Sequence, residues 1–354
     1  ICGGICCILL RGVKNDASRK EFQNIGHRLF HLPQRIPSKQ RSLTKMSKSV
    51  GIITFHASYN YGSMLQAYAL QSILRALGTE VSLINFRSQA QKNIYSLHPQ
   101  GVGFQKKGKA LAKLLFFPSV RRKNARFEDF LCSRFHLTPA YATPGELAAS
   151  CPEFDVYLSG SDQIWNTDAS DFSEAYLLTF AGAHRKVAYA ASFGPIGRFR
   201  NAEWKAMMRK ALADYHAISV REEKSAALVR ELTGREVPVV VDPVLLLSQA
   251  QWGKILPAAP KKAERKYILF YTLYYEKDLE QTVRMISQKL GLPVVITKYV
   301  SYKEVLSPYR KEADCGPCEF LRLLQNAELV ISASFHGTAF SILFNRSEEH
   351  TSEL

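Results

Sequence analysis

The feature that most constrains this chain is a series of short apolar runs, each closed by a turn and most of them followed by a helical pattern. The runs lack the polar alternation of a half-buried strand, so they are buried on both faces, as in a parallel sheet covered by helices. The predicted strands are residues 50–55, 81–86, 154–159, 186–193, 217–221, 237–241, 266–273, 294–297 and 329–333. The predicted helices are residues 64–77, 222–232, 277–290 and 319–327, with a further helix opening at Thr338. This alternation predicts an α/β fold with parallel sheets.

The alternation of strands and helices is interrupted once, which divides the chain into two domains. Residues 248–265 (SQAQWGKILPAAPKKAER) have the proline, alanine and charge content of a linker. We therefore expect an N-terminal α/β domain at 46–247 and a C-terminal α/β domain at 266–345. A chain of 354 residues is long enough to give each domain a core.

The two ends of the chain do not share this pattern. Residues 1–45 show no sustained period, and Met46 is followed almost at once by the first predicted strand. We interpret 1–45 as translated upstream sequence, with a disordered arm as the alternative. The last helical pattern stops at Asn345, and 346–354 (RSEEHTSEL) reads as a translated sequencing adapter. We therefore expect the second domain to be truncated at its C-terminal end.

Charge points to the kind of partner. The net charge is +16 at pH 7, which suits an anionic substrate or an anionic surface. Much of the excess lies in residues 106–123 (KKGKALAKLLFFPSVRRK). This stretch is either a solvated helical face or a surface that meets an anionic acceptor or a membrane. No helix-turn-helix, zinc-finger or RNA-binding motif is present, so we expect no nucleic-acid partner.

Cysteine usage and hydropathy point to a compartment. The seven cysteines are an odd number and are scattered over a large chain, which favours reduced thiols. No apolar run approaches the ~20 residues that a membrane-spanning helix needs. We expect a cytoplasmic protein, with peripheral association at the inner face of the membrane as a further possibility.

The first turn, after residues 50–55, is a candidate ligand site. Its sequence, SYNYGSMLQAY, contains neither a G-x-G-x-x-G fingerprint nor a P-loop. One interpretation is a simple turn made by Asn60 and Gly62, with Ser63 as the helix N-cap. The other is a sugar or anion site at the helix start, where Asn60, Tyr61 and Gly62 face the ligand.

A second candidate follows the predicted strand 154–159, in the sequence GSDQIWN. Ser161, Asp162 and Gln163 place hydrogen-bonding groups next to an aromatic ring, a combination typical of sugar sites. The alternative is that Asp162 caps a helix and Trp165 fills the core.

The third candidate is Arg221, the last residue of the predicted strand 217–221. An arginine at the carboxyl end of a parallel strand is well placed to bind a phosphate or carboxylate with two parallel hydrogen bonds. Pairing with Glu222 or Glu223 is the alternative.

The fourth candidate is the turn after residues 329–333. Ser334, His336, Gly337 and Thr338 lie between a buried strand and a helix, where a parallel α/β sheet places its ligands. His336 is either an acid/base group at this junction or a capping histidine at the edge of the core.

Cys315 and Cys318 form a C-x-x-C pair, but its context does not match a redox or zinc motif. No strand of a thioredoxin-like unit precedes the pair, and no second pair accompanies it. Gly316 and Pro317 between them are better read as the start of a helix.

Taken together, these segments resemble the polysaccharide pyruvyl transferase family over about residues 50–345. The motifs that carry the resemblance are GIITFHASYNYGSMLQAYALQ, DVYLSGSDQIWN, AISVREEKS, VVVDPVLLL and GPCEFLRLLQNAELVISASFHGTAFSILFN. The resemblance implies a GT-B-like architecture of two Rossmann-like domains with the active site between them. It also implies that His336, in the S-x-H-G motif, takes part in catalysis, and that Arg221, in the V-R-[DE] motif, binds phosphoenolpyruvate.

The implied reaction transfers pyruvate as a ketal from phosphoenolpyruvate to a sugar of a surface polysaccharide or its lipid-linked precursor. We assign His336 as the acid/base and Asp162 as a second catalytic candidate that binds the acceptor hydroxyl. We expect no metal and no cofactor beyond the donor substrate. A basic residue that the resemblance implies beyond the last helix is absent from this sequence, so this chain is expected to have impaired activity.

Two other functions remain as alternatives. One is a glycosyltransferase of the same fold that uses a nucleotide sugar. The other is a non-catalytic protein that binds anions or glycans.

Overall fold

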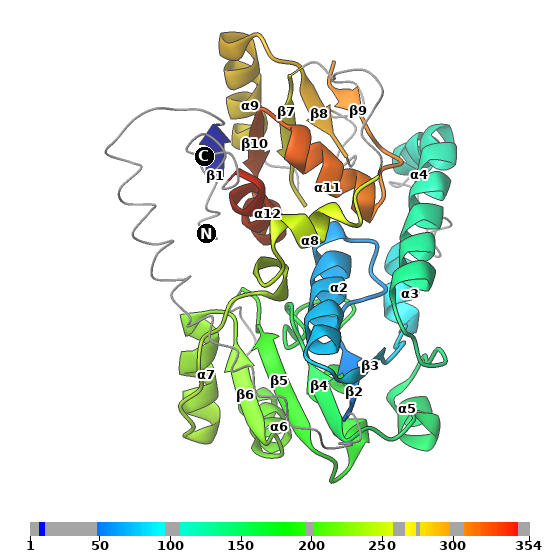
Figure 1. Cartoon of the computed structure of the whole chain (residues 1–354), viewed down its shortest axis with the longest axis vertical. Coiled ribbons are helices and arrows are strands. Elements are labelled where there is room, and N and C mark those ends of the chain that lie inside the picture. The colour runs from blue at the N-terminus through cyan, green and yellow to red at the C-terminus, as the bar shows by residue number, and fades with distance from the viewer. Residues whose placement is uncertain are drawn as a thin grey trace.

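The computed structural model describes residues 7–10, 48–95, 107–195, 201–257, 266–273, 277–297 and 308–345. These residues form two α/β lobes, each built on a five-stranded sheet (Figure 1). The α/β fold expected from the sequence is therefore confirmed.

The first lobe is an entirely parallel sheet in the order β3-β2-β4-β5-β6. Its strands are β2 (Ser49–Ile53), β3 (Glu80–Leu83), β4 (Val156–Ser159), β5 (Lys186–Ala191) and β6 (Ala217–Val220). Its helices are α2 (Tyr61–Ala76), α3 (Gln89–Tyr95), α4 (Lys107–Arg134), α5 (Pro144–Ser150), α6 (Ala202–Ala213) and α7 (Glu223–Thr233), with short 3-10 turns η2 (Glu174–Leu177), η3 (Thr179–Ala181) and η4 (Pro243–Leu245). The strand order reverses between β2 and β4, which is where such sheets bind ligands.

The second lobe has the strand order β1-β10-β7-β8-β9. Its strands β7 (Ile268–Tyr271), β8 (Val294–Ile296), β9 (Arg310–Lys311) and β10 (Leu329–Ser332) are parallel, whereas β1 (Cys7–Leu10) is antiparallel to β10. Its helices are α9 (Lys277–Leu290), α11 (Pro317–Asn326) and α12 (Phe335–Asn345). The order reverses between β7 and β10, so the turn after β10 lies at this lobe's switch point.

Three strand assignments differ from those expected. Strand β1 lies inside residues 1–45, where we expected no regular structure, and the rest of 1–45 lies outside the described residues. Strand β9 was not expected. Residues 237–241 form only an isolated bridge between Val220 and Val239, and Val239 is 39% exposed. Pro238 has no N–H to donate to a sheet, which explains why this run is not a buried strand.

The expected linker 248–265 is partly helical. Ser248 and Gln251 form a capping box that starts helix α8 (Gln249–Gly253). The buried Trp252 of α8 packs against Phe340 of the second lobe and Tyr68 of the first, with ring centroids 5.1 and 5.8 Å away. The first part of this segment is thus an ordered joint between the lobes, and 258–265 lie outside the described residues.

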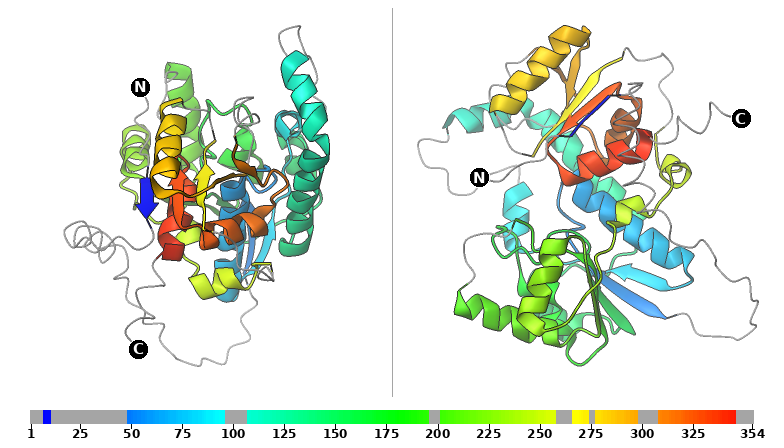
Figure 2. Two further views of the ribbon diagram at one scale, coloured as in Figure 1. Left: turned by 90° about the horizontal axis from the view of Figure 1, so that it is seen from above. Right: turned by 90° about the vertical axis from the view of Figure 1, so that its left-hand side faces the viewer.

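One hydrophobic core joins the two lobes. Tyr61 of α2 stacks on Phe320 of α11 with ring centroids 4.2 Å apart and an interplanar angle of 7°. Helix α2 lies between the two sheets, and it contacts both α11 and α12 (Figure 2). The lobes therefore share buried apolar surface instead of meeting only at a flexible connection.

The basic stretch 106–123 falls largely in helix α4, which runs beside both lobes in Figure 1. Arg122 Nε lies 2.9 Å from Asp314 Oδ2 of the second lobe, and Arg126 Nη1 donates to the carbonyl of Asp314 at 2.8 Å. Arg122, within this stretch, and Arg126, just after it, therefore bind α4 to the second lobe. Within the described ranges, no helix is both long and apolar enough to cross a bilayer.

Candidate active site

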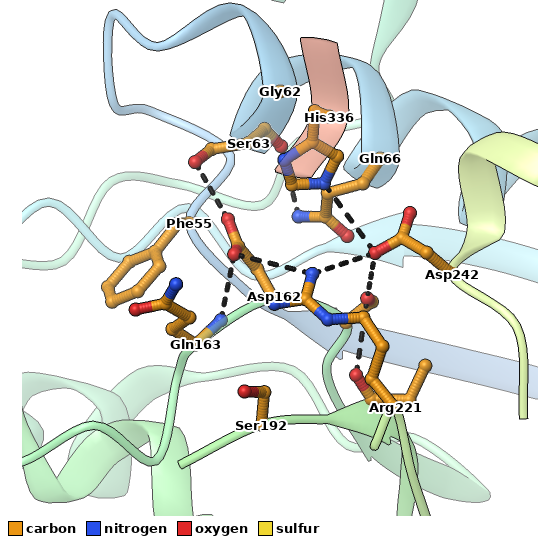
Figure 3. A network of polar contacts seen from close by, with 12 residues as sticks. Phe55, Gly62, Ser63, Gln66, Asp162, Gln163, Ser192, Arg221, Asp242 and His336 are labelled. Atoms are coloured by element: carbon orange, nitrogen blue, oxygen red, sulfur yellow. Dashed lines mark hydrogen bonds and ion pairs between the residues drawn. The ribbon is translucent and has the colours of Figure 1, made fainter. Parts of the chain in front are cut away.

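Polar residues from both lobes converge where the carboxyl ends of their strands face each other. Ser161 and Asp162 follow β4, Arg221 follows β6 and His336 follows β10 (Figure 3). The start of α2 completes the group. Carboxyl ends of parallel strands are where open α/β sheets place their ligands, so this junction is the candidate site.

Asp242 is the centre of the cluster. Its Oδ2 accepts hydrogen bonds from Arg221 Nη1 and from Ser161 Oγ, both at 2.9 Å. His336 Nε2 lies 3.5 Å from the same oxygen. The other oxygen, Oδ1, accepts from the backbone N–H of Val244 at 3.1 Å, which starts turn η4. One buried carboxylate thus links the arginine of the first lobe to the histidine of the second.

The charged groups of this cluster stabilise one another in their charged forms. Burial acts to raise the pKa of Asp242, but His336, Arg221 and the Val244 amide outweigh it and hold that pKa well below its ordinary value. Burial acts to lower the pKa of Arg221, but the nearby carboxylates, Asp242 first, raise it above its ordinary value. Asp242 and Arg221 therefore form a charged pair at neutral pH.

Asp162 extends the cluster toward α2. Its Oδ2 accepts from Ser63 Oγ at 2.7 Å, and its Oδ1 accepts from the backbone N–H of Gln163 at 2.8 Å. Oδ1 also lies 3.8 Å from Arg221 Nη1. Asp162 has a positive φ of 78°, a conformation that aspartate tolerates better than most residues. Its carboxylate therefore joins the first turn of α2 to the arginine.

One glycine lets the histidine approach the first lobe, and a second lets α12 pack on its own sheet. A Cβ built on Gly62 would lie 2.3 Å from His336 Nδ1, so the imidazole rests directly on the backbone of α2. A Cβ built on Gly337 would lie 2.3 Å from Ser332 Oγ, so α12 packs closely on the strand before it. Both residues serve the site by making room, and His336 itself is buried.

The predicted residues of the first turn have different roles from those expected. Asn60, not Ser63, is the N-cap of α2, because its side chain accepts from the N–H groups of Gly62 and Ser63. The Ser63 hydroxyl is bonded to Asp162 instead. Tyr61 is a buried core residue whose hydroxyl donates to the carbonyl of Cys315 at 3.0 Å. The expected ligand contact of Tyr61 is therefore replaced by packing between the lobes.

The turn after β10 is also shorter than expected. Helix α12 begins at Phe335, so His336 lies in its first turn, and the expected start at Thr338 was wrong by one turn. The carbonyl of Ser334 accepts from the N–H of Thr338 at 3.0 Å, and the N–H of Ser334 donates to Ser332 Oγ at 3.0 Å. Ser334 and Thr338 therefore shape the helix start.

Gln163 lies beside the cluster rather than in it. Its side-chain Oε1 accepts from Asn166 Nδ2 at 3.3 Å, and only its backbone N–H reaches Asp162. Trp165 is fully buried in the core of the first lobe, as the alternative interpretation of this segment expected.

Comparison with known families decides the identity. The sequence model of the family described as polysaccharide pyruvyl transferase matches residues 60–347, most of the chain. The chain belongs to this family.

Solved structures with a similar backbone fold include sugar-processing enzymes. A UDP-GlcNAc 2-epimerase from Methanocaldococcus jannaschii has 12% sequence identity and a TM-score of 0.42, with 84% of this chain and 82% of that chain covered. The E. coli heptosyltransferase with a bound ADP-heptose analogue has 14% identity and a TM-score of 0.39, with 84% and 86% covered. None of the curated proteins matches the chain significantly.

Membership in the pyruvyl transferase family makes the chain a transferase that acts on a sugar or polysaccharide acceptor. Its fold is GT-B-like, with two Rossmann-like lobes whose carboxyl strand ends face each other, as the resemblance implied. The predicted residues that the structure brings together are Ser161, Asp162, Arg221 and His336.

The sequence reasoning missed Asp242 as a member of this cluster. The local signal was the Asp-Pro step that closes the apolar run 237–241. Gln66 was missed as well, because it looks like any polar residue of a helix. Its Nε2 donates to Thr54 Oγ1 at 2.9 Å and to the carbonyl of Ser63 at 3.0 Å, which holds the first turn of α2 against β2.

The C-x-x-C pair is structural in this transferase. Gly316 and Pro317 begin α11, with the Glu319 side chain accepting from the Gly316 N–H at 3.1 Å. Burial raises the pKa of Cys315 far above its ordinary value and that of Cys318 to about 11. Both thiols are therefore protonated at neutral pH and poor nucleophiles.

Proposed function

We propose that this protein transfers the pyruvate group of phosphoenolpyruvate onto two hydroxyls of an acceptor sugar, forming a ketal and releasing phosphate. One observation carries the proposal: His336 of one lobe and Arg221 of the other contact the same oxygen of Asp242, at 3.5 and 2.9 Å. A proton-transfer group and an anion-binding group thus share one site in a member of a pyruvyl transferase family.

Arg221 is the donor-binding residue in this proposal. A guanidinium has five N–H donors. Asp242 occupies Nη1, and within the described residues no acceptor is bonded to Nη2. Nη2 is thus left for the phosphate or carboxylate of the donor. The guanidinium carbon lies 4.3 Å from the ring centroid of Phe335, the first residue of α12.

The groups around Arg221 are acidic, and its Nε lies 3.7 Å from Glu222 Oε2, the pairing that the alternative interpretation of this residue expected. The described groups that pair with Arg221 are the carboxylates of Asp162, Glu222 and Asp242. Phosphoenolpyruvate carries about three negative charges, so its binding must overcome repulsion from these carboxylates.

His336 is the acid/base in this proposal. It donates a proton to C3 of phosphoenolpyruvate, which makes C2 electrophilic, and one sugar hydroxyl then forms a bond to C2. The C2–O bond to phosphate breaks, and the second hydroxyl bonds to C2 and closes the ketal. One hydroxyl proton returns to the imidazole and the other leaves with phosphate, so the protons balance. Asp242 orients the imidazole of His336, and the Asp162 carboxylate accepts a hydrogen bond from a hydroxyl of the sugar.

Phosphate release tests the proposal. Wild-type protein is incubated with phosphoenolpyruvate and lipid-linked sugars, and inorganic phosphate and the sugar ketal are measured. Phosphate and ketal formed in equal amounts support the proposal. If the protein instead releases the nucleotide from a nucleotide sugar, and is thermally stabilised by that ligand, it is a glycosyltransferase. Binding of phosphoenolpyruvate without any turnover would show a non-catalytic binding protein.

A further inference from the structure

Phe335 is the exposed aromatic residue of the helix that carries His336. It is 48% exposed, whereas Phe340 and Phe344 of the same helix are buried at 0% and 5%. A single exposed apolar residue is common on protein surfaces and by itself means little. The neighbours of Phe335 make its exposure informative.

Both reaction groups of the proposed site contact the Phe335 ring. The Arg221 guanidinium carbon lies 4.3 Å from the ring centroid, in the geometry of a cation–π contact. The His336 ring centroid lies 5.1 Å away, with the two rings at 86°. Arg221 and His336 side chains are only 7% and 9% exposed. Phe335 is thus the solvent-facing surface that directly adjoins two buried polar groups.

The chemistry of an aromatic ring indicates which substrate meets this surface. The Arg221 guanidinium lies over one face of the ring. The face of an aromatic ring carries partial negative charge, so the exposed part of Phe335 offers no attraction to the highly anionic phosphoenolpyruvate. A pyranose presents weakly positive C–H groups on one face and hydroxyls at its rim. Its C–H face suits the exposed part of the Phe335 ring, which lies beside Arg221 and His336.

We propose that Phe335 is the platform on which the pyranose ring of the acceptor packs, and that it positions the sugar hydroxyls for transfer. This assignment rests on the proposed function of the His336 site, because it takes the acceptor to be a sugar. In this assignment Arg221 binds the donor, His336 moves the proton, and Phe335 selects the acceptor.

The competing role for Phe335 is to hold Arg221 in place through the cation–π contact. Loss of the ring would then weaken phosphoenolpyruvate binding and leave sugar binding unchanged. The two roles therefore predict opposite patterns for the two ligands.

The test measures the two ligands separately in Phe335 variants of the full chain. Methyl glucopyranoside, galactopyranoside and mannopyranoside are the sugar probes, observed by saturation-transfer NMR, and phosphoenolpyruvate binding is measured by calorimetry. Phe335→Ala removes the ring, Phe335→Leu keeps apolar bulk without it, and Phe335→Tyr restores it. Ile342→Ala is the matched control, because Ile342 is on the same helix and is 39% exposed.

We expect the wild type to bind at least one pyranoside with saturation transfer to its ring C–H protons. Phe335→Ala and Phe335→Leu should weaken that binding about tenfold, the upper range for an aromatic contact. Phe335→Tyr and Ile342→Ala should bind as the wild type does, and phosphoenolpyruvate affinity should change less than about twofold.

Three results would overturn the platform: a wild type that binds none of the pyranosides, Phe335→Ala that binds them normally, or Phe335→Ala that loses only phosphoenolpyruvate. Failure of the proposed function gives a different result. Pyranoside binding would then depend on Phe335 while the wild type fails to bind phosphoenolpyruvate.

Discussion

At the scale of the residue, the site depends on a single buried carboxylate. Asp242 is 1% exposed and contacts Arg221, Ser161 and His336 through one oxygen. Removing one partner of a buried ion pair leaves the other charge unpaired. This lowers the free energy of unfolding by far more than the intact pair contributes to it. Asp242 should therefore matter to both folding and activity.

Asp242→Asn should destabilise the protein by about 3 kcal/mol at pH 7, because it leaves Arg221 buried without its nearest anion. The folded-state pKa of Asp242 is depressed. The stability it contributes is therefore fully present above the unfolded pKa of about 3.9 and is lost as pH falls through the folded value. Urea unfolding at pH 7, 5 and 3 gives the difference in free energy of unfolding between the wild type and Asp242→Asn. This difference should be equal at pH 7 and 5 and smaller at pH 3. A difference that is already smaller at pH 5 would contradict the assignment.

His336→Asn should lower turnover by about 100-fold or more, because proton transfer by a positioned side chain contributes at least that much. The buried site is kept in shape by Asp242 and Arg221, so the unfolding temperature should change little. His136→Asn, at an exposed position outside the cluster, is the control and should be fully active. Steady-state phosphate release measures both. Normal turnover in His336→Asn would remove the histidine from the mechanism.

At the scale of the element, the start of α2 positions the histidine through Gly62. A Cβ at Gly62 would lie 2.3 Å from His336 Nδ1, and one at Gly145, in helix α5, would have its nearest neighbour 3.8 Å away. A Cβ added at Gly62 therefore clashes with the imidazole, whereas a Cβ added at Gly145 has room.

Gly62→Ala should displace the His336 ring and reduce turnover, even though alanine favours a helix by up to about 1 kcal/mol. Gly145→Ala should leave turnover unchanged and raise stability slightly for the same propensity reason. Turnover and thermal unfolding of the two variants check this. Equal turnover in both variants would mean that the imidazole does not rest on α2 during the reaction.

Much of the element pattern could be predicted from the sequence. Helix α9 has the expected bounds of 277–290, and most strands of both sheets lie within the expected runs. Some errors concern whole elements, because β1, β9 and α8 were not expected and the run 237–241 is not a strand. Other errors fall at element ends, where a cap decides the boundary. Ser63 and Asn60 are both good N-caps by type, and only the partner Asp162, distant in sequence, determines which one caps α2.

The site was predictable where a residue stands at the carboxyl end of a buried strand. Arg221, Asp162 and His336 fit that rule and are brought together. Tyr61 did not fit, because an aromatic residue in the core and one facing a ligand look alike in a sequence. Asp242 was missed because its role comes from contacts to three elements, which no local pattern encodes.

At the scale of the whole molecule, the lobes should unfold as one unit, because they share a hydrophobic core. Tyr61 of the first lobe packs on Phe320 and Tyr271 of the second, with ring centroids 4.2 and 5.8 Å away. Calorimetry should therefore show one cooperative transition. Two separate transitions would show that the lobes are independent.

Tyr61→Ala should lower stability by about 3–5 kcal/mol, the usual cost of removing a large buried aromatic side chain. Tyr61→Phe keeps the ring and removes only the hydroxyl, which donates to the carbonyls of Cys315 at 3.0 Å and Thr297 at 3.5 Å, so it should cost about 1 kcal/mol. Chemical unfolding of the three proteins measures the difference. A similar loss in both variants would place the stabilisation in the hydroxyl rather than in the ring.

The central claim is that Arg221 and His336, from opposite lobes, serve one bound phosphoenolpyruvate. A double-mutant cycle tests it most directly, with phosphoenolpyruvate affinity measured by calorimetry for the wild type, Arg221→Lys, His336→Asn and the double variant. Residues that share a ligand should be coupled by at least about 0.5 kcal/mol, so the double variant should bind differently from the sum of the single effects. Additive effects, or a wild type that does not bind phosphoenolpyruvate, would contradict the claim.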